Sequence, residues 1–211
     1  MTEEPIWSIL ICTLASRQDK FLRLMDVLLP QAEEMGEVEI VACHNNGERP
    51  LGEIRQALMM DARGKYLSFV DDDDEVPDYF VREMLLALWE DPDVVGFITE
   101  YSEREAAWRA TVYNSLQYEP HDTPGKLYRD LVHQMPCRAE LAKQGVFTRG
   151  WPEDNTWRNV VRPLLKTEVY IDKVLYYYRH SWADSVQGQL APPPYTPRPV
   201  IESPVFRWLD S

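Results

Sequence analysis

Short apolar runs alternate with segments of helical period through the first hundred residues, and this alternation constrains the fold more than any other feature. Four runs have the length of buried strands: 6–13, 38–43, 65–70 and 94–99. Between them, apolar residues recur every three or four positions, which predicts helices over 17–34, 52–63 and 77–90. Strand–helix–strand units of this kind join by right-handed crossovers into a mostly parallel sheet. The sequence therefore predicts an α/β fold with helices flanking a central sheet.

The second half of the chain is less regular. Its pattern predicts strands over 106–113 and 173–180, helices over 138–145 and 153–165, and a loop with a short helix over 114–135. Six prolines fall within 192–204, which is typical of an extended segment that becomes ordered only when it docks on something. We expect one domain over residues 1–185, with halves 1–104 and 105–185, followed by a proline-rich tail over 186–211.

Charge and composition exclude several classes of protein. The net charge of −13 comes from residues 1–104, which carry 9 Lys+Arg and 23 Asp+Glu, whereas the remainder is near neutral. Such an acidic chain is a poor general binder of nucleic acid, since phosphate contacts dominate that affinity. No apolar run approaches the roughly 20 residues that span a bilayer, and the acidic N-terminus is unlike a secretory signal. Three widely spaced cysteines predict reduced thiols. We therefore expect a cytoplasmic protein.

Four consecutive aspartates, Asp71–Asp74, directly follow the predicted strand 65–70. Like charges repel, so the run needs water or a cation nearby. In parallel sheets, ligands sit at the carboxyl ends of the strands, where the turn 44–48 also falls, so we expect the run and the turn to line one crevice. Carboxylates there suit a divalent cation that also holds substrate phosphates. A solvated acidic loop is the alternative, which we favour less because a helix start follows at once.

Four stretches of the sequence resemble a known family in their order and spacing: "SILICTLASR", "FLRLMDVLLPQ", "VEIVACHNNGE" and "ALMMDARGKYLSFVDDDD". The sequence resembles the nucleotide-sugar glycosyltransferases of GT-A fold, family two, closely over 6–100 and more loosely over 130–185. The resemblance implies a Rossmann-like, mostly parallel central sheet flanked by helices. It also implies that 1–104 binds nucleotide and metal, and that 105–185 binds the acceptor.

The resemblance assigns roles to the aspartate run. Asp73 would coordinate Mn²⁺ or Mg²⁺ bridging the donor diphosphate, and Asp71 would face the ribose or the water shell of the metal. Asp72 would lie near the donor with a less defined role, and Asp74 would contact the sugar or begin the next helix. His180, after the last predicted strand, would return to the diphosphate and metal.

Other residues would contact the nucleotide. Thr13 and Arg17 lie in the family's first loop, and Arg55 matches a basic residue near the donor. The family's base-binding aspartate is missing here, and His44 or Asn45 takes its place. A UDP-sugar is slightly favoured. Asn45 has a simple turn as its alternative interpretation, because Asn–Gly favours one, and both arginines have solvated helical charges as theirs.

Transfer to a hydroxyl with inversion requires a carboxylate to accept a proton. The family's base lies in an acidic pair opening a helix, which here is Glu153 and Asp154, with Asp154 as the base. Helix capping is the alternative, since acidic residues are favoured in a first turn. His133 is a candidate to approach donor or acceptor, with structural hydrogen bonding as its alternative. Three aromatic residues would stack on sugars or anchor the core: Trp151, Trp157 and Trp182.

The sequence therefore predicts a metal-dependent, inverting glycosyltransferase that uses a nucleoside-diphosphate-sugar donor. Its acceptor would be a protein, a saccharide, a small molecule or a modified nucleic-acid base, and a homodimer through the tail is a further hypothesis. A nucleotidyltransferase is less favoured because "CTLASRQDK" lacks the glycine-rich loop that holds a triphosphate. A non-catalytic nucleotide- or partner-binding module of the same fold is the rival from another class.

Overall fold

The computed structural model describes residues 4–103, 109–149, 152–180 and 197–209. Within these residues the strands are β1 (Trp7–Leu14), β2 (Val38–Asn45), β3 (Tyr66–Phe69), β4 (Val94–Glu103), β5 (Arg109–Asn114), β6 (His121–Thr123), β7 (Lys126–Arg129), β8 (Cys137–Arg138), β9 (Glu168–His180) and β10 (Phe206–Trp208). The α-helices are α1 (Gln18–Met35), α2 (Leu51–Asp61), α3 (Phe80–Leu88), α4 (Ala139–Ala142) and α5 (Asp154–Val161), with 3₁₀ turns at Ala15–Arg17 and Arg162–Leu164.

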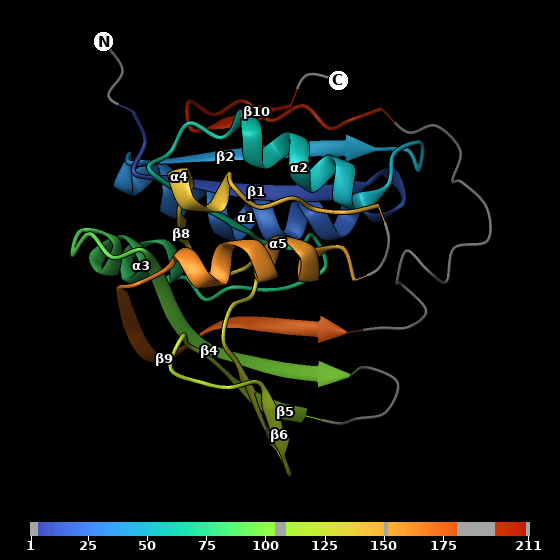
Figure 1. Cartoon of the computed structure of the whole chain (residues 1–211). Helices are drawn as coiled ribbons and strands as arrows, with labels where there is room; N and C mark the ends of the chain where they lie inside the picture. The colour runs from blue at the N-terminus through green and yellow to red at the C-terminus, as the bar shows by residue number, and fades with distance from the viewer. Residues whose placement is uncertain (1–3, 104–108, 150–151, 181–196, 210–211) are drawn as a thin grey trace.

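The strands form one sheet in the order β10-β2-β1-β3-β8-β4-β5-β7-β6, and β9 pairs with β4. The first four strands in this order run parallel, and β9 is parallel to β4. Figure 1 shows α2, α4 and α5 on one face of the sheet and α1 on the other. On that second face the Gln31 amide donates to Pro77 O and accepts from the Val81 N–H, both at 3.0 Å, which joins α1 to α3. The predicted α/β fold with a mostly parallel, helix-flanked sheet is confirmed.

Several predicted elements differ in the second half. The helix predicted over 138–145 is limited to Ala139–Ala142, and the strand predicted over 173–180 begins earlier, at Glu168. The loop with a short helix expected over 114–135 contains the antiparallel strands β6 and β7 instead, joined by a turn in which Gly125 has φ +74°. All three residues of β6 are exposed, so this strand carries no hydrophobic alternation that the sequence could reveal. The helix predicted over 153–165 becomes a 3₁₀ turn after Val161, since Pro163 cannot donate the next helical hydrogen bond.

The end of the predicted tail is part of the sheet. Residues 206–208 form β10, which pairs in parallel with β2, with Phe206 opposite Ile40. The Phe21 ring lies 6.4 Å from Phe206 and 5.3 Å from Trp208, so the strand also packs on α1. This portion of the tail is therefore a strand rather than an extended arm, whereas 186–196 lies outside the described residues.

The three cysteines, Cys12, Cys43 and Cys137, are free thiols, as expected. Burial raises the pKa of all three, that of Cys137 to about 12, which keeps them protonated. No helix within the described ranges is long and apolar enough to cross a membrane.

Candidate active site

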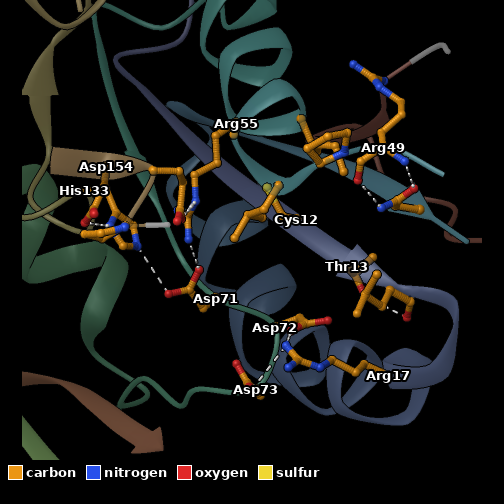
Figure 2. A pocket seen from close by; sticks show the side chains of 18 of the residues that line it. Cys12, Thr13, Arg17, Arg49, Arg55, Asp71, Asp72, Asp73, His133 and Asp154 are labelled. Atoms are coloured by element: carbon orange, nitrogen blue, oxygen red, sulfur yellow. Dashed lines mark hydrogen bonds and ion pairs between the residues drawn. The ribbon is translucent and has the colours of Figure 1, made fainter. Parts of the chain in front are cut away.

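A cavity of about 620 Å³ opens at the carboxyl ends of β1, β2 and β3 (Figure 2). Ten of the sequence-predicted site residues line it: Thr13, Arg17, Asn45, Arg55, Asp71, Asp72, Asp73, Glu153, Asp154 and His180. The crevice expected to unite the aspartate run with the turn after β2 is therefore present. It brings together residues from both halves of the chain.

Asp71 is held at the end of β3 by residues from three other segments. Its backbone N–H donates to the Tyr176 hydroxyl of β9 at 3.0 Å. Arg55 Nη2 donates to Asp71 Oδ1 at 2.9 Å, and the Gln134 side-chain amide reaches Asp71 Oδ2 at 3.4 Å. Burial alone would raise the pKa of Asp71, but the charges of Arg55 and His133 outweigh it and hold that pKa well below its usual range. Asp71 is therefore a firmly ionised carboxylate.

Arg55 is buried, which excludes the interpretation as a solvated helical charge. Only 4% of the residue is exposed, and its guanidinium lies 5.0 Å from the centre of the Phe69 ring. Its Nε lies 3.2 Å from Glu153 Oε1 while Nη2 binds Asp71. A buried guanidinium requires such anionic partners. Glu153 therefore helps to hold Arg55 in place, and its own side chain is only 10% exposed.

His133 bridges the aspartate run and the candidate base. Its backbone carbonyl accepts the Phe69 N–H at 2.9 Å, which fixes the residue beside the end of β3. Its Nε2 lies 3.3 Å from Asp71 Oδ2, and its Nδ1 lies 3.1 Å from Asp154 Oδ2. Burial and Arg55 would lower the pKa of His133, but the two carboxylates outweigh them and raise it. The sequence named His133 as a candidate to contact donor or acceptor, with structural hydrogen bonding as the alternative. The bridge connects Asp71, which follows β3, with Asp154 at the start of α5. No short sequence motif indicates that these two segments meet.

Asp154 begins α5, and its carboxylate faces the cavity. Burial would raise its pKa, but the hydrogen bond and charge of His133 and the charge of Arg55 lower it. Its side chain is 30% exposed, compared with 10% for Glu153. Of the two acidic residues that the sequence proposes here, Asp154 is therefore the one that an incoming molecule can reach.

Arg17 pairs with the next two aspartates. One nitrogen, Nη1, lies 3.0 Å from Asp72 Oδ1 and 3.3 Å from Asp73 Oδ2. The Arg17 side chain is 12% exposed, so it is not the solvated helical charge that was the alternative. Burial raises the pKa of Asp72 to about 6, with Arg17 opposing and Asp73 adding to that shift. Burial raises the pKa of Asp73 as well, again against Arg17.

The side-chain amide of Asn45 closes a turn. Its Nδ2 donates to Arg49 O at 3.0 Å, and its Oδ1 accepts the Arg49 N–H at 3.3 Å. The alternative interpretation of Asn45 as a turn residue therefore accounts for its amide, although the residue also lines the cavity. His44 does not line the cavity; its ring packs edge-on against Trp208 at 6.1 Å.

Asp73 and His180 are predicted metal ligands that line the cavity; Asp73 pairs with Arg17, and the His180 ring stacks on Tyr101 at 6.2 Å. Asp71 already uses both oxygens for Arg55, His133 and Gln134. Among the residues that the structure describes, no group of three or more His, Cys, Asp or Glu is arranged to hold a metal ion. The sites that proteins offer to Mg²⁺ commonly provide one or two carboxylates, and the substrate phosphates complete the shell. Asp73, whose side chain lines the cavity and is 20% exposed, offers such a carboxylate.

Several residues of the cavity were missed or differ from expectation. Residues that line it without having been named include Cys12, Arg49, Gln134, Arg149, Tyr178 and Arg179. Asp74 does not begin a helix: its Oδ1 accepts the Arg179 N–H at 2.8 Å, which ties the run to β9.

Trp157 is a core anchor, 2% exposed, whose indole donates to Ala142 O at 3.1 Å. Trp151 and Trp182 lie outside the described residues.

Comparison with known proteins agrees with this architecture. Two solved structures of S. aureus TarS 1–349 are similar: the complex with UDP, at TM-score 0.61 and 17% identity, and the complex with UDP-GlcNAc, at 0.58 and 16%. The matches cover 83% and 82% of this chain but only 60% and 58% of the TarS chains, and at such identity they show the fold alone. No curated protein sequence matches the chain.

The family itself is established by sequence. Residues 15–140 match the sequence model of Glycosyl transferase family 2, and this region is more than half of the chain. It begins at the 3₁₀ turn that follows β1, contains the aspartate run and His133, and ends in α4. The chain therefore belongs to glycosyl transferase family 2, with the GT-A fold of the nucleotide-sugar glycosyltransferases.

Proposed function

We propose that this protein transfers a sugar from a nucleoside-diphosphate donor to an acceptor hydroxyl, with inversion at the anomeric carbon. The observation that carries the proposal is the shared cavity: the ionised Asp154 faces the same space as Asp71 and Asp73, and His133 links the two sides. The resemblance to TarS, whose structures hold UDP and UDP-GlcNAc, supports a UDP-sugar as the donor.

Asp154 acts as the general base. Its carboxylate takes the proton of the acceptor hydroxyl as the acceptor oxygen bonds to the anomeric carbon, and the bond from that carbon to the diphosphate oxygen breaks with its electron pair on the leaving group. The lowered pKa keeps Asp154 ionised at neutral pH, so it is ready to accept that proton. His133, bonded to Asp154 Oδ2, orients the carboxylate toward the cavity.

Glu153 and Arg55 support this base rather than share its role. The Arg55 guanidinium lies between Glu153 and Asp71 and fixes both sides of the cavity to α2. A geometry held by buried ion pairs places the acceptor and donor in register, which contributes to rate by orientation.

Asp73 and His180 would hold Mn²⁺ or Mg²⁺ together with the donor diphosphate. Such a cation supplies positive charge to the departing diphosphate. Arg17 contacts Asp73 at the same point of the cavity and so contributes positive charge from the chain itself.

The test combines nucleotide binding with turnover. We expect UDP with Mn²⁺ to raise the melting temperature more than ADP, GDP or CDP does, since a ligand that binds only the folded state stabilises it. Asp73→Ala should lose the part of the shift that needs Mn²⁺. Asp154→Asn should keep the UDP shift but release UDP from UDP-GlcNAc or UDP-glucose about 10²-fold more slowly or worse.

Glu140→Gln, an exposed change on α4, is the control for a general effect of removing a carboxylate. A variant Asp154→Asn with undiminished UDP release would contradict the role of the base. If UDP binds but the wild-type protein releases none from any UDP-sugar supplied with saccharide, peptide or water as acceptor, a non-catalytic nucleotide-binding module becomes the better description.

A further inference from the structure

We propose that Arg17 acts as a built-in counter-ion, which occupies the aspartate run in the donor-free protein and is displaced onto the diphosphate when donor and divalent cation bind together. Cation and nucleotide then bind cooperatively. The cation alone would leave the Arg17 guanidinium without an anionic partner, and the nucleotide alone would leave the aspartate run without a cationic one. The inference rests on the proposed function. It adds a role for Arg17 in coupling the binding of the cation to the binding of the nucleotide.

The contacts place Arg17 directly on the acidic residues that a cation requires. A single guanidinium nitrogen reaches Asp72 Oδ1 and Asp73 Oδ2, at 3.0 and 3.3 Å (Figure 2). Asp73 is the carboxylate that is best placed to receive a metal, since Asp71 is fully used by other partners. A cation and a guanidinium that share one carboxylate repel each other. Entry of a cation at Asp73 must therefore weaken the contact with Arg17.

The Arg17 side chain can reach an alternative anionic partner within the cavity. It ends the short 3₁₀ turn that joins β1 to α1, and it lines the same cavity as Thr13 and Leu14. A long side chain anchored on this turn can exchange its carboxylate partner for a phosphate oxygen at little cost, since arginine binds both kinds of oxyanion. A diphosphate bound beside Asp73 would supply that new partner.

The remaining charge favours a cation of higher valence. One guanidinium carries a single positive charge, whereas it faces two carboxylates, Asp72 at 3.0 Å and Asp73 at 3.3 Å, so it cannot balance the charge of both when they are ionised. Asp72 Oδ2 is buried and has no hydrogen-bond partner among the described residues, although the residue is only 2% exposed. The run can therefore still attract a divalent cation once Arg17 has another anion to bind.

The cooperativity has a defined thermodynamic signature. If displacement of Arg17 opposes the binding of the cation alone, UDP must tighten Mn²⁺ binding, and Mn²⁺ must tighten UDP binding by the same factor. Removing the guanidinium abolishes both its competition with Mn²⁺ for the aspartates and the tightening of Mn²⁺ binding by UDP. Arg17→Ala should therefore bind Mn²⁺ alone more tightly than the wild-type protein, and UDP should change its Mn²⁺ affinity less.

The experiment is a Mn²⁺ titration followed by electron paramagnetic resonance, with and without UDP, on the full chain. We expect Arg17→Ala to bind Mn²⁺ alone about fivefold more tightly or better, and to lose most of the tightening by UDP. Arg17→Gln, which keeps a polar but uncharged side chain, guards against misfolding of the alanine variant. Arg82→Ala is the control, since Arg82 is exposed on α3 and pairs with Glu83.

The outcomes separate this inference from the proposed function. If UDP and Mn²⁺ bind but both Arg17 variants bind Mn²⁺ alone no more tightly than the wild type, Arg17 is no counter-ion and the inference fails while the transferase proposal stands. If UDP binds and Mn²⁺ never does, metal dependence fails and the inference fails with it. If neither UDP nor Mn²⁺ binds, the donor site itself is refuted.

Discussion

At the scale of single residues, the site is a set of charges that are held out of water by one another. The sequence located these residues because positions at the carboxyl ends of parallel strands converge whatever the details of packing. It did not reveal the pairs, since Arg55 finds Asp71 from a neighbouring helix and His133 finds Asp154 across 21 residues. Helical periodicity cannot distinguish a buried arginine from a solvated one when its partners lie on other elements.

Asp72 carries the clearest consequence of this burial for stability. Its pKa in the folded protein, about 6, lies above the ordinary 3.8, so the folded state binds the proton more tightly than the unfolded state does. The stability that this adds is complete below about pH 4 and is lost as the pH rises through 6. Asp72→Asn should therefore gain about 2 kcal/mol of unfolding free energy over the wild type between pH 4 and pH 8.

Urea unfolding at pH 4.5 and 7.5, in EDTA, measures this difference. Asp78→Asn, at an exposed position on the same loop, is the control. Its unfolding free energy should differ from that of the wild type by the same amount at both pH values. Equal pH dependence for Asp72→Asn and the wild type would refute the assignment of the penalty to Asp72.

At the scale of elements, the strands and helices of residues 6–99 follow the sequence closely, because each strand is a continuous apolar run and each helix has one apolar face. The hairpin β6–β7 could not be found in this way, since an exposed strand has no face to bury. The cavity, however, depends on how elements meet. One such meeting is between α2 and the loop before α5, where a Cβ added at Gly52 would lie 1.8 Å from Thr148 O.

Gly52→Ala tests whether this approach holds the two sides of the cavity together. The added methyl group would also meet Glu153 at 3.3 Å, so α2 and the start of α5 must separate. We expect a loss of about 1–3 kcal/mol in unfolding free energy and a fall in UDP release from UDP-sugars, with UDP affinity less affected.

Met60→Ala is the matched control on α2, since that side chain is 54% exposed and the residue lies at the other end of the helix from Gly52. Turnover and stability equal to the wild type in Gly52→Ala would show that the loop adapts without moving Asp154.

At the scale of the whole molecule, the sheet is assembled from distant segments of the chain. The end of β9 pins the aspartate run, through Tyr177 against Glu75 and the Arg179 N–H on Asp74, so the second half of the chain shapes the site in the first. At the opposite edge, β10 covers β2 after a separation of more than 150 residues. Neither pairing has a local signature, since it depends on which edge is left open once the other strands have paired.

Phe206 is the residue through which β10 secures that edge. It is 9% exposed, and its ring lies 5.1 Å from Trp208 and 6.4 Å from Phe21 of α1. Without β10, the row of β2 backbone groups that Val205 O and the Leu209 N–H now satisfy would be an open edge, on which a second chain can pair. We expect Phe206→Ala to lose about 3 kcal/mol of unfolding free energy and to form concentration-dependent oligomers in sedimentation experiments. Val200→Ala, at a position 88% exposed, should stay within about 0.5 kcal/mol of the wild type. If Phe206→Ala matched that control in both measurements, the Phe206 contacts of β10 would contribute nothing to stability, and β2 would be stable as an edge strand by itself.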